Sequence, residues 1–156
     1  MNRFFDITGI NSRELLPQEI VSRGYSADIA YFELLEPLRF KSDIAGGTIT
    51  LPVGFLSDLA SIPAMAAWFM TSDSPKIAAG AWIHDYLYAN RGEIPVWTDS
   101  GWIQVKLTRA QCDAVLAYEA MPDLMASKAQ QTTVYQVLRR FGNQWPQNGF
   151  MERLQG

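Results

Sequence analysis

One short segment of the chain carries residue types suited to acid–base chemistry. Residues 81–88 contain the single histidine of the 156-residue sequence, His84, which is followed directly by Asp85 and, four residues later, by Tyr88. Histidine is the side chain that changes charge near neutral pH without help from its surroundings. If the protein performs general acid–base catalysis, His84 is therefore the first candidate for the base.

The segment is predicted to lie on a helix over residues 75–89, because Ser74 can cap that helix and a proline follows it at the first helical position. On such a helix His84 and Tyr88 share one face. Asp85 points about 100° away from His84. The histidine therefore needs an orienting partner from another element.

Asp113 is the candidate partner. It lies one turn inside a second predicted helix, which starts at the capping box of Thr108 and Gln111 and reaches about residue 121. Its face carries small residues, which permit close helix approach, and a buried acid needs partners. If the two helices pack antiparallel, Asp113 accepts a hydrogen bond from one imidazole nitrogen of His84, and the other nitrogen is free to activate a water. In this arrangement Tyr88 supports Asp113.

Asp85 faces a different side of the helix, where it is a candidate ligand for a divalent cation together with Asp58. Calcium and zinc are the candidate ions, and no other cofactor is expected. Asp58 and Ser61 lie just before a predicted buried helix over residues 64–70, so the alternative role of Asp58 is to satisfy free N–H groups at the start of that helix.

A purely structural interpretation of the same residues stays open. A lone histidine on an aromatic-rich helix is commonly a hydrogen-bonded core residue, and the cluster of His84, Asp113 and Tyr88 can hold two helices together without any reaction. Cys112 is expected to be a small buried hydrophobic residue, because no second histidine is present to activate its thiol.

The remaining elements indicate an α+β fold: a single domain in which a small antiparallel sheet packs on about four helices. Alternating apolar and β-branched residues predict strands within residues 29–55, and a hairpin is expected around residues 98–101. Pro17 is expected to interrupt a short helix. A last long helix is predicted from Pro122-Asp123 to about Phe141. The predicted divisions are an N-terminal extension over 1–28, a globular domain over 29–145 and a C-terminal tail over 146–156.

Charge and composition narrow the classes of partner and compartment that we expect for the protein. The net charge is −3, and no block of basic residues provides the footprint of a nucleic-acid backbone. One cysteine cannot form an internal disulfide, which suits a reducing compartment. No apolar run approaches the length of a transmembrane segment, and the N-terminus has no signal-peptide core.

Four ordered motifs resemble a small phage and prophage family that is known only as a domain of unknown function. They are Gly54-Phe-Leu-Ser-Asp-Leu-Ala-Ser-Ile-Pro63, His84-Asp-Tyr-Leu-Tyr88, Arg109-Ala-Gln-Cys-Asp113 and Tyr135…Arg139…Gly142…Trp145. The sequence departs from the family pattern at Ser57 (usually Thr), Ala64 (often Arg) and Cys112 (usually Ala). The resemblance implies a phage-encoded protein that is made in the cytoplasm of the bacterial host.

A more local resemblance is to the active site of secreted phospholipase A2. In that family a His-Asp-x-x-Tyr helix supplies the base and a calcium ligand, and a Cys-Asp pair on an antiparallel helix orients the base. His84, Asp85, Tyr88 and Asp113 match this layout, whereas the Gly-rich calcium loop and the disulfides are missing.

Two functions follow as hypotheses. The first is a phage hydrolase that cleaves an ester or amide of a lipid or cell-envelope substrate, with His84, Asp113 and Tyr88 as catalytic residues and Asp85 and Asp58 as metal ligands. The second is a non-enzymatic virion or assembly component of the tail or head–tail region. In that case the N-terminal extension and the Trp-containing tail contact other phage structural proteins.

Overall fold

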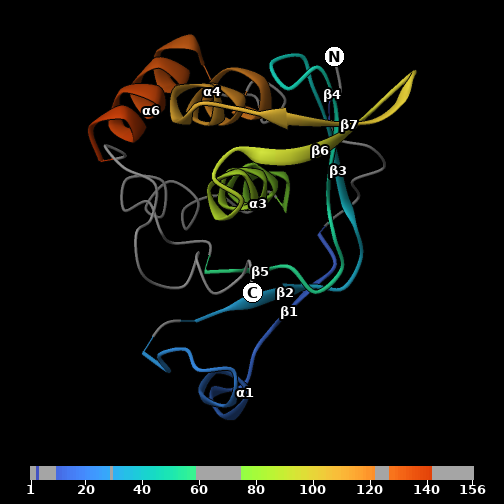
Figure 1. The fold of residues 1–156 in the computed structure, drawn as a ribbon. Coiled ribbons are helices and arrows are strands. Elements are labelled where there is room, and N and C mark those ends of the chain that lie inside the picture. Colours follow the sequence, from blue (N-terminus) through green and yellow to red (C-terminus); the bar gives the residue numbers. More distant parts are fainter. Residues whose placement is uncertain (1–2, 4–9, 29, 59–74, 122–126, 142–156) are drawn as a thin grey trace.

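The computed structural model describes residues 3, 10–28, 30–58, 75–121 and 127–141. Within these ranges the chain forms helices and two antiparallel sheets, so the predicted α+β class is confirmed. Helix α3 (Pro75–Ala89) lies between the hairpin of β6 (Glu93–Thr98) and β7 (Gly101–Lys106) on one side and strand β5 (Leu56–Ser57) on the other (Figure 1). Helix α3 therefore lies between strands of the two sheets.

The larger sheet has four strands in the order β3-β4-β6-β7. Its strands are β3 (Leu38–Ser42), β4 (Gly47–Leu51), β6 (Glu93–Thr98) and β7 (Gly101–Lys106). The predicted hairpin is present, with Trp97 paired to Trp102 across β6 and β7. Gly47 is required where β4 passes β6, because a Cβ there would lie 2.6 Å from the carbonyl oxygen of Trp97.

The smaller sheet has three strands in the order β1-β2-β5: β1 (Ser12–Glu14), β2 (Phe32–Leu34) and β5 (Leu56–Ser57). The single small sheet expected from the sequence is therefore two sheets. The chain changes from β2 to β3 at Glu36-Pro37, where proline has no N–H to donate to a strand ladder. Strand β1 comes from the predicted N-terminal extension and pairs with β2.

Two helix boundaries differ from those predicted. Helix α1 (Pro17–Ser22) begins at Pro17 instead of being interrupted there, because the missing N–H of a proline costs nothing in the first turn. Helix α6 (Lys128–Phe141) begins after Ser127, not at Pro122-Asp123. The hydroxyl of Ser127 accepts a hydrogen bond from the backbone N–H of Gln130, and this cap fixes the start of the helix.

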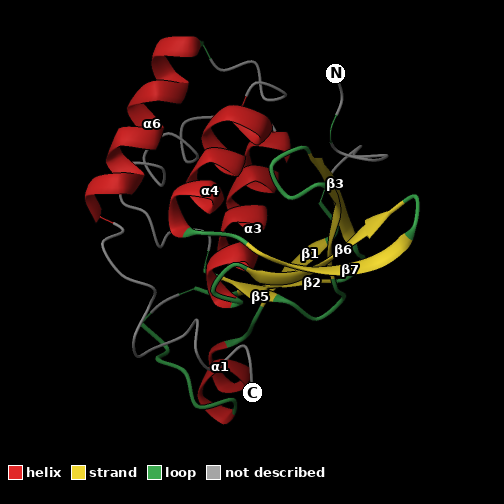
Figure 2. Ribbon diagram, turned by 45° about the horizontal axis from the view of Figure 1, so that its top comes forward, coloured by secondary structure: helices red, strands yellow, loops and turns green. Residues whose placement is uncertain are grey.

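The predicted helix over residues 108–121 is present in two parts, α4 (Arg109–Ala114) and the π-helical segment η1 (Val115–Ala120). Its capping box forms as expected, with Thr108 and Gln111 exchanging side-chain and backbone hydrogen bonds. Figure 2 shows α3, α4 and α6 on one side of the strands. The predicted helix over 64–70 lies outside the described residues.

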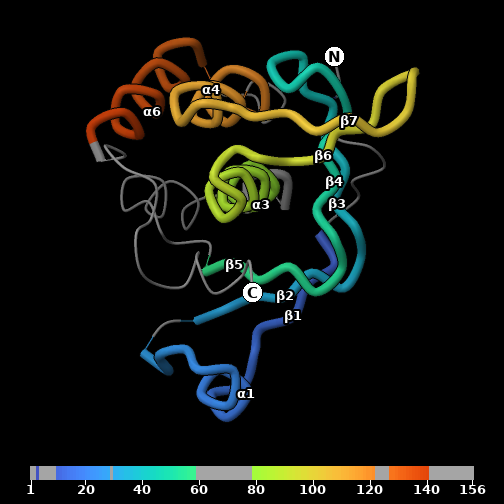
Figure 3. Tube along the Cα trace, viewed as in Figure 1, coloured from blue at the N-terminus to red at the C-terminus, as the bar shows by residue number. Residues whose placement is uncertain are grey.

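The main core fills the space between the four-stranded sheet and the helices. Strand side chains Phe40, Ile49 and Val96 pack there with Ile83 and Leu87 of α3, and none of them is exposed. A second small core joins α1 to β1, β2 and β5. It lies at the opposite end of the molecule from α6 (Figure 3). Within the described ranges, no helix combines the length and apolar character needed to span a bilayer.

Candidate active site

His84 occupies a buried position on α3. Residues 81–87 are all buried, and His84 retains only 3% of its accessible surface. Helix α3 begins at Pro75, and its last turn closes at Arg91 and Gly92, whose backbone N–H groups bond to the carbonyls of Tyr88 and Leu87. The register of this helix places Tyr88 one turn after His84, and their rings are 4.2 Å apart between centroids.

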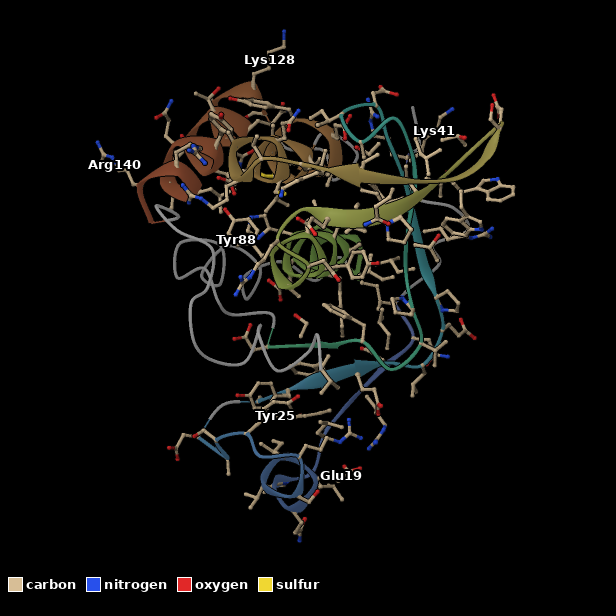
Figure 4. All side chains as sticks on the ribbon, in the orientation of Figure 1. Glu19, Tyr25, Lys41, Tyr88, Lys128 and Arg140 are labelled. Atoms are coloured by element: carbon tan, nitrogen blue, oxygen red, sulfur yellow. The ribbon has the colours of Figure 1, made fainter. Side chains whose placement is uncertain are left out.

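Asp113 lies opposite these two side chains on α4 and is fully buried. Its Oδ1 atom is 3.0 Å from Nε2 of His84 and accepts a hydrogen bond of 2.5 Å from the hydroxyl of Tyr88. The predicted contact between the histidine and the acid is therefore present. Figure 4 shows Tyr88 on α3 at the side that faces α4. One carboxylate oxygen thus joins two positions of α3 to α4.

Arg139 of α6 completes the environment of Asp113. Its Nη1 atom donates to Oδ2 of Asp113 over 3.0 Å, and the arginine side chain is 32% exposed. In the sequence Arg139 stands out only as part of a motif, and no local pattern identifies it as a partner of Asp113. The single carboxylate therefore connects three helices, α3, α4 and α6.

The protonation of this cluster follows from its charges. Burial by itself would raise the pKa of Asp113, but the hydrogen bonds from His84, Tyr88 and Arg139 outweigh burial and lower it. An ionised carboxylate only accepts hydrogen bonds, so Nε2 of His84 carries a proton toward Asp113. Burial and the adjacent carboxylate both raise the pKa of the Tyr88 phenol, which therefore stays protonated and donates.

The second imidazole nitrogen of His84 has a different environment. Nδ1 is buried and has no hydrogen-bond partner among the described residues. In a neutral ring that donates from Nε2, the lone pair lies on Nδ1. One imidazole nitrogen is therefore held by Asp113, and the lone pair of the other has no hydrogen-bond donor among the described residues, as a general base requires.

Asp85 is directed to another partner, as its position on the helix predicts. It is buried, and one of its carboxylate oxygens accepts a short hydrogen bond from the hydroxyl of Ser57 on β5. Asp58 follows Ser57 directly in the chain and is partly buried. The described residues thus place both predicted metal ligands near the end of β5, away from the Asp113 side of His84.

The contacts of Asp85 bear on the predicted metal site. In the described part of the chain, no three His, Cys, Asp or Glu side chains gather closely enough to hold a metal ion. One oxygen of Asp85 is engaged by Ser57, whereas calcium prefers six to eight oxygen ligands.

Cys112 is buried, and burial raises the pKa of its thiol to about 12, so it is a poor nucleophile at neutral pH.

One comparison with known protein families matches the part of the chain that contains this site. A family model with the description "Protein of unknown function (DUF1353)" matches residues 32–138, which is well over half of the sequence and includes α3, α4 and most of α6. No curated protein and no solved structure matches the chain.

Proposed function

The chain belongs to the DUF1353 family of unknown function, and we propose from its geometry that it is a hydrolase in which His84 acts as general base. The observation that supports this proposal is the asymmetry of the two imidazole nitrogens. Nε2 is fixed by the buried Asp113, and Nδ1 has no hydrogen-bond partner in the described part of the protein. Nδ1 is then the atom that takes a proton from the attacking water.

In the proposed reaction each neighbouring residue has a separate role. Asp113 fixes the tautomer and orientation of His84 and stabilises the imidazolium that forms when the ring takes up a proton. Tyr88 and Arg139 hold Asp113 in place by hydrogen bonds. The same layout of base, orienting acid and supporting tyrosine is expected from the local resemblance to secreted phospholipase A2, which is an analogy of site geometry and not of fold.

Substrate must reach a ring of which only 3% of the surface is exposed. The reaction therefore requires an opening at α3 before water and substrate approach Nδ1. A lipid or cell-envelope ester or amide is the proposed substrate class for a phage-encoded enzyme. A calcium or zinc ion at Asp85 and Asp58 would polarise the scissile carbonyl or phosphoryl group.

The test is turnover of a panel of carboxylic and phosphate p-nitrophenyl esters by the wild type and by His84→Gln, with and without added calcium or zinc. We expect His84→Gln to abolish turnover while thermal melting changes little. Tyr118→Phe, an exposed position on η1, is the matched control and keeps full activity. Full turnover by His84→Gln, or a large loss of stability without any wild-type turnover, contradicts the hydrolase.

A second candidate function, a non-enzymatic assembly component, is favoured by the exposed hairpin. Trp97 and Trp102 are 49% and 58% exposed, and their rings meet edge to face with centroids 5.3 Å apart. Strand β7 is an edge of the four-stranded sheet and also exposes Ile103. Exposed aromatic pairs and free strand edges are typical of protein interfaces.

The second candidate predicts association through this hairpin. Sedimentation of the wild type with purified particles of a phage that encodes this chain should show binding that Trp102→Ser removes. The exposed polar substitution Gln104→Ser on the same strand is the control. The C-terminal tail, which was also expected to contact neighbouring subunits, lies outside the described residues. Equal association of the wild type and Trp102→Ser contradicts a hairpin interface.

A further inference from the structure

A second feature beside the histidine cluster is a pocket of about 570 Å³ at the start of α4. Four of its lining residues are basic: Arg91, Lys106, Arg109 and Arg139. No acid lines it among the described residues. This concentration of positive charge runs against the net charge of −3 of the whole chain, so it is a local property of this pocket.

The four basic residues come from four different places in the chain. Arg91 follows the C-terminus of α3, Lys106 ends β7, Arg109 is the first residue of α4, and Arg139 lies near the end of α6. Like charges repel, and folding gathers these side chains around one hollow. An anion in the hollow would relieve that repulsion.

Arg91 also adopts a costly backbone conformation. Its φ angle is +53°, which makes it the one non-glycine residue with positive φ in the described part of the chain. The position is the left-handed residue of a Schellman motif, with N–H groups of Arg91 and Gly92 bonded to the carbonyls of Tyr88 and Leu87. Glycine is the usual residue there, and strained residues cluster at binding sites. A side chain is thus kept where glycine fits better.

Lys106 and Arg139 each have a carboxylate partner. Glu93 pairs with Lys106 at 2.8 Å, but both side chains are more than half exposed, where an ion pair contributes little. Asp113 pairs with Arg139. Arg109 has no ion pair among the described residues, and its Nη1 atom is buried without a hydrogen-bond partner there. A buried guanidinium N–H without an acceptor is costly. Because Arg109 also lines the pocket, a bound oxyanion would supply an acceptor once the guanidinium group turns toward it.

We propose that this pocket binds the phosphate group of a small ligand. Guanidinium groups present paired N–H donors that match the oxygens of a phosphate, and Lys106 adds a mobile cation. The volume lies in the range of small-molecule sites, so a phosphate group would occupy only part of this open depression. The proposal goes beyond the hydrolase and does not depend on it, because none of its observations requires His84 to act as a base.

The pocket is nevertheless connected to the histidine cluster. Arg139 lines the pocket and also donates to Asp113. The charge of Arg109 acts on the Tyr88 phenol, where it opposes the increase in pKa caused by burial and by Asp113. A phosphate bound in the pocket would therefore lie beside Arg139, which in turn contacts Asp113, the group that orients His84.

The test is calorimetric titration of the full chain with inorganic phosphate at low ionic strength, together with sedimentation with phosphatidylcholine vesicles that do or do not contain phosphatidylglycerol. The two arms distinguish a soluble phosphate from a lipid headgroup. The variants are Arg109→Gln, Lys106→Gln and Arg91→Gly. Arg140→Gln is the matched control, because Arg140 neighbours Arg139 but extends away from the protein (Figure 4).

We expect the wild type to bind, and Arg109→Gln to bind about tenfold more weakly, as the loss of one charged hydrogen bond implies. Lys106→Gln should also bind phosphate more weakly. Its side chain is 78% exposed, so a loss of binding in this variant cannot come from a disrupted core. Arg91→Gly should weaken binding while raising the melting temperature. Arg140→Gln binds as the wild type does.

Binding in either arm with this pattern supports the site and identifies its source of phosphate. Absence of binding in both arms overturns the proposal, as does binding that Arg109→Gln and Lys106→Gln leave unchanged. Neither result depends on turnover, so failure of the phosphate site and failure of the hydrolase are separate outcomes.

Discussion

Nε2 of His84 lies 3.0 Å from Oδ1 of Asp113, and this contact between two buried side chains joins α3 to α4. Because Asp113 also accepts from Tyr88 and Arg139, its carboxylate receives hydrogen bonds from an imidazole, a phenol and a guanidinium group. An ionised acid with three donors is stable in the interior, and its charge determines which imidazole nitrogen carries the proton.

The tautomer of His84 is the most direct prediction. Since the chain has one histidine, labelling with ¹⁵N-histidine gives a single imidazole, and long-range ¹H–¹⁵N spectra identify its protonated nitrogen. We expect the neutral ring to carry its proton on Nε2, because the ionised Asp113 can only accept. Asp99→Asn, on the exposed turn of the hairpin, should leave the spectrum unchanged. A neutral ring protonated on Nδ1 would contradict both the proposed base and the assignment of Asp113 as acceptor.

Loss of the Asp113 charge should destabilise the fold. Asp113→Asn keeps the shape of the side chain but leaves Arg139 facing a neutral amide and removes an acceptor from His84 or Tyr88. We expect the free energy of unfolding to fall by about 3 kcal/mol, as for other broken buried ion pairs. Urea denaturation measures it. Asp99→Asn, an exposed substitution, should change stability by less than about 0.5 kcal/mol, and equal values for the two variants would show that the cluster adds no stability.

The same acid predicts a pH dependence. The folded-state pKa of Asp113 is lowered, because the hydrogen bonds from His84, Tyr88 and Arg139 outweigh the effect of burial. Its contribution to stability is therefore fully present above the unfolded carboxyl pKa of about 4 and is lost as the pH falls through the lower folded value. The difference in unfolding free energy between wild type and Asp113→Asn should shrink below about pH 4. Urea denaturation at a series of pH values checks this, and a difference that grows on acidification would contradict the shift.

Part of the site could be predicted because its signals are local. The helical spacing of His84 and Tyr88 fixes their common face, and the capping box at Thr108 sets the register that turns Asp113 inward. The hairpin was predictable for the same reason, since the turn before Gly101 lies between two alternating runs.

The other partners could not be predicted, because they are brought together only by the tertiary fold. Ser57 meets Asp85 from 28 positions away, and Arg139 reaches Asp113 across 26 positions. Periodicity says which face of a helix is apolar, but not which helix packs against it. The division into two sheets also depends on the path after Pro37, and no local pattern gives the partner of a strand.

Glu119 is a buried acid that the sequence did not single out. Its carboxylate accepts hydrogen bonds from the hydroxyl of Ser42 and from the backbone N–H groups of Asp43 and Ile44, and so closes the turn between β3 and β4. Glu119→Ala should cost about 2–4 kcal/mol, since several buried donors lose a charged acceptor. Chemical denaturation measures the loss. The exposed Glu14→Ala serves as control, and a Glu119→Ala variant as stable as this control would show that water replaces the carboxylate.

Two glycines with similar backbone angles should respond differently to alanine. Gly24 and Gly92 both close helix ends with positive φ, +82° and +74°, so a Cβ strains the backbone at each. An added Cβ at Gly24 meets nothing within 4 Å, whereas at Gly92 it would lie 2.1 Å from the carbonyl oxygen of Leu107. We expect Gly24→Ala to cost about 1 kcal/mol and Gly92→Ala at least about 2 kcal/mol more, because backbone atoms must move apart.

The contact at Gly92 also positions the phosphate pocket. The N–H of Leu107 donates to the carbonyl of Gly92 over 2.9 Å, which holds the end of β7 against the turn after α3. Arg91 and Lys106 flank these two residues in the chain and line the pocket. Gly92→Ala should therefore lower phosphate binding as well as stability, whereas Gly24→Ala leaves binding intact. Thermal melting and titration of both variants measure the two effects, and equal losses of stability would show that the turn after α3 accommodates the extra methyl group.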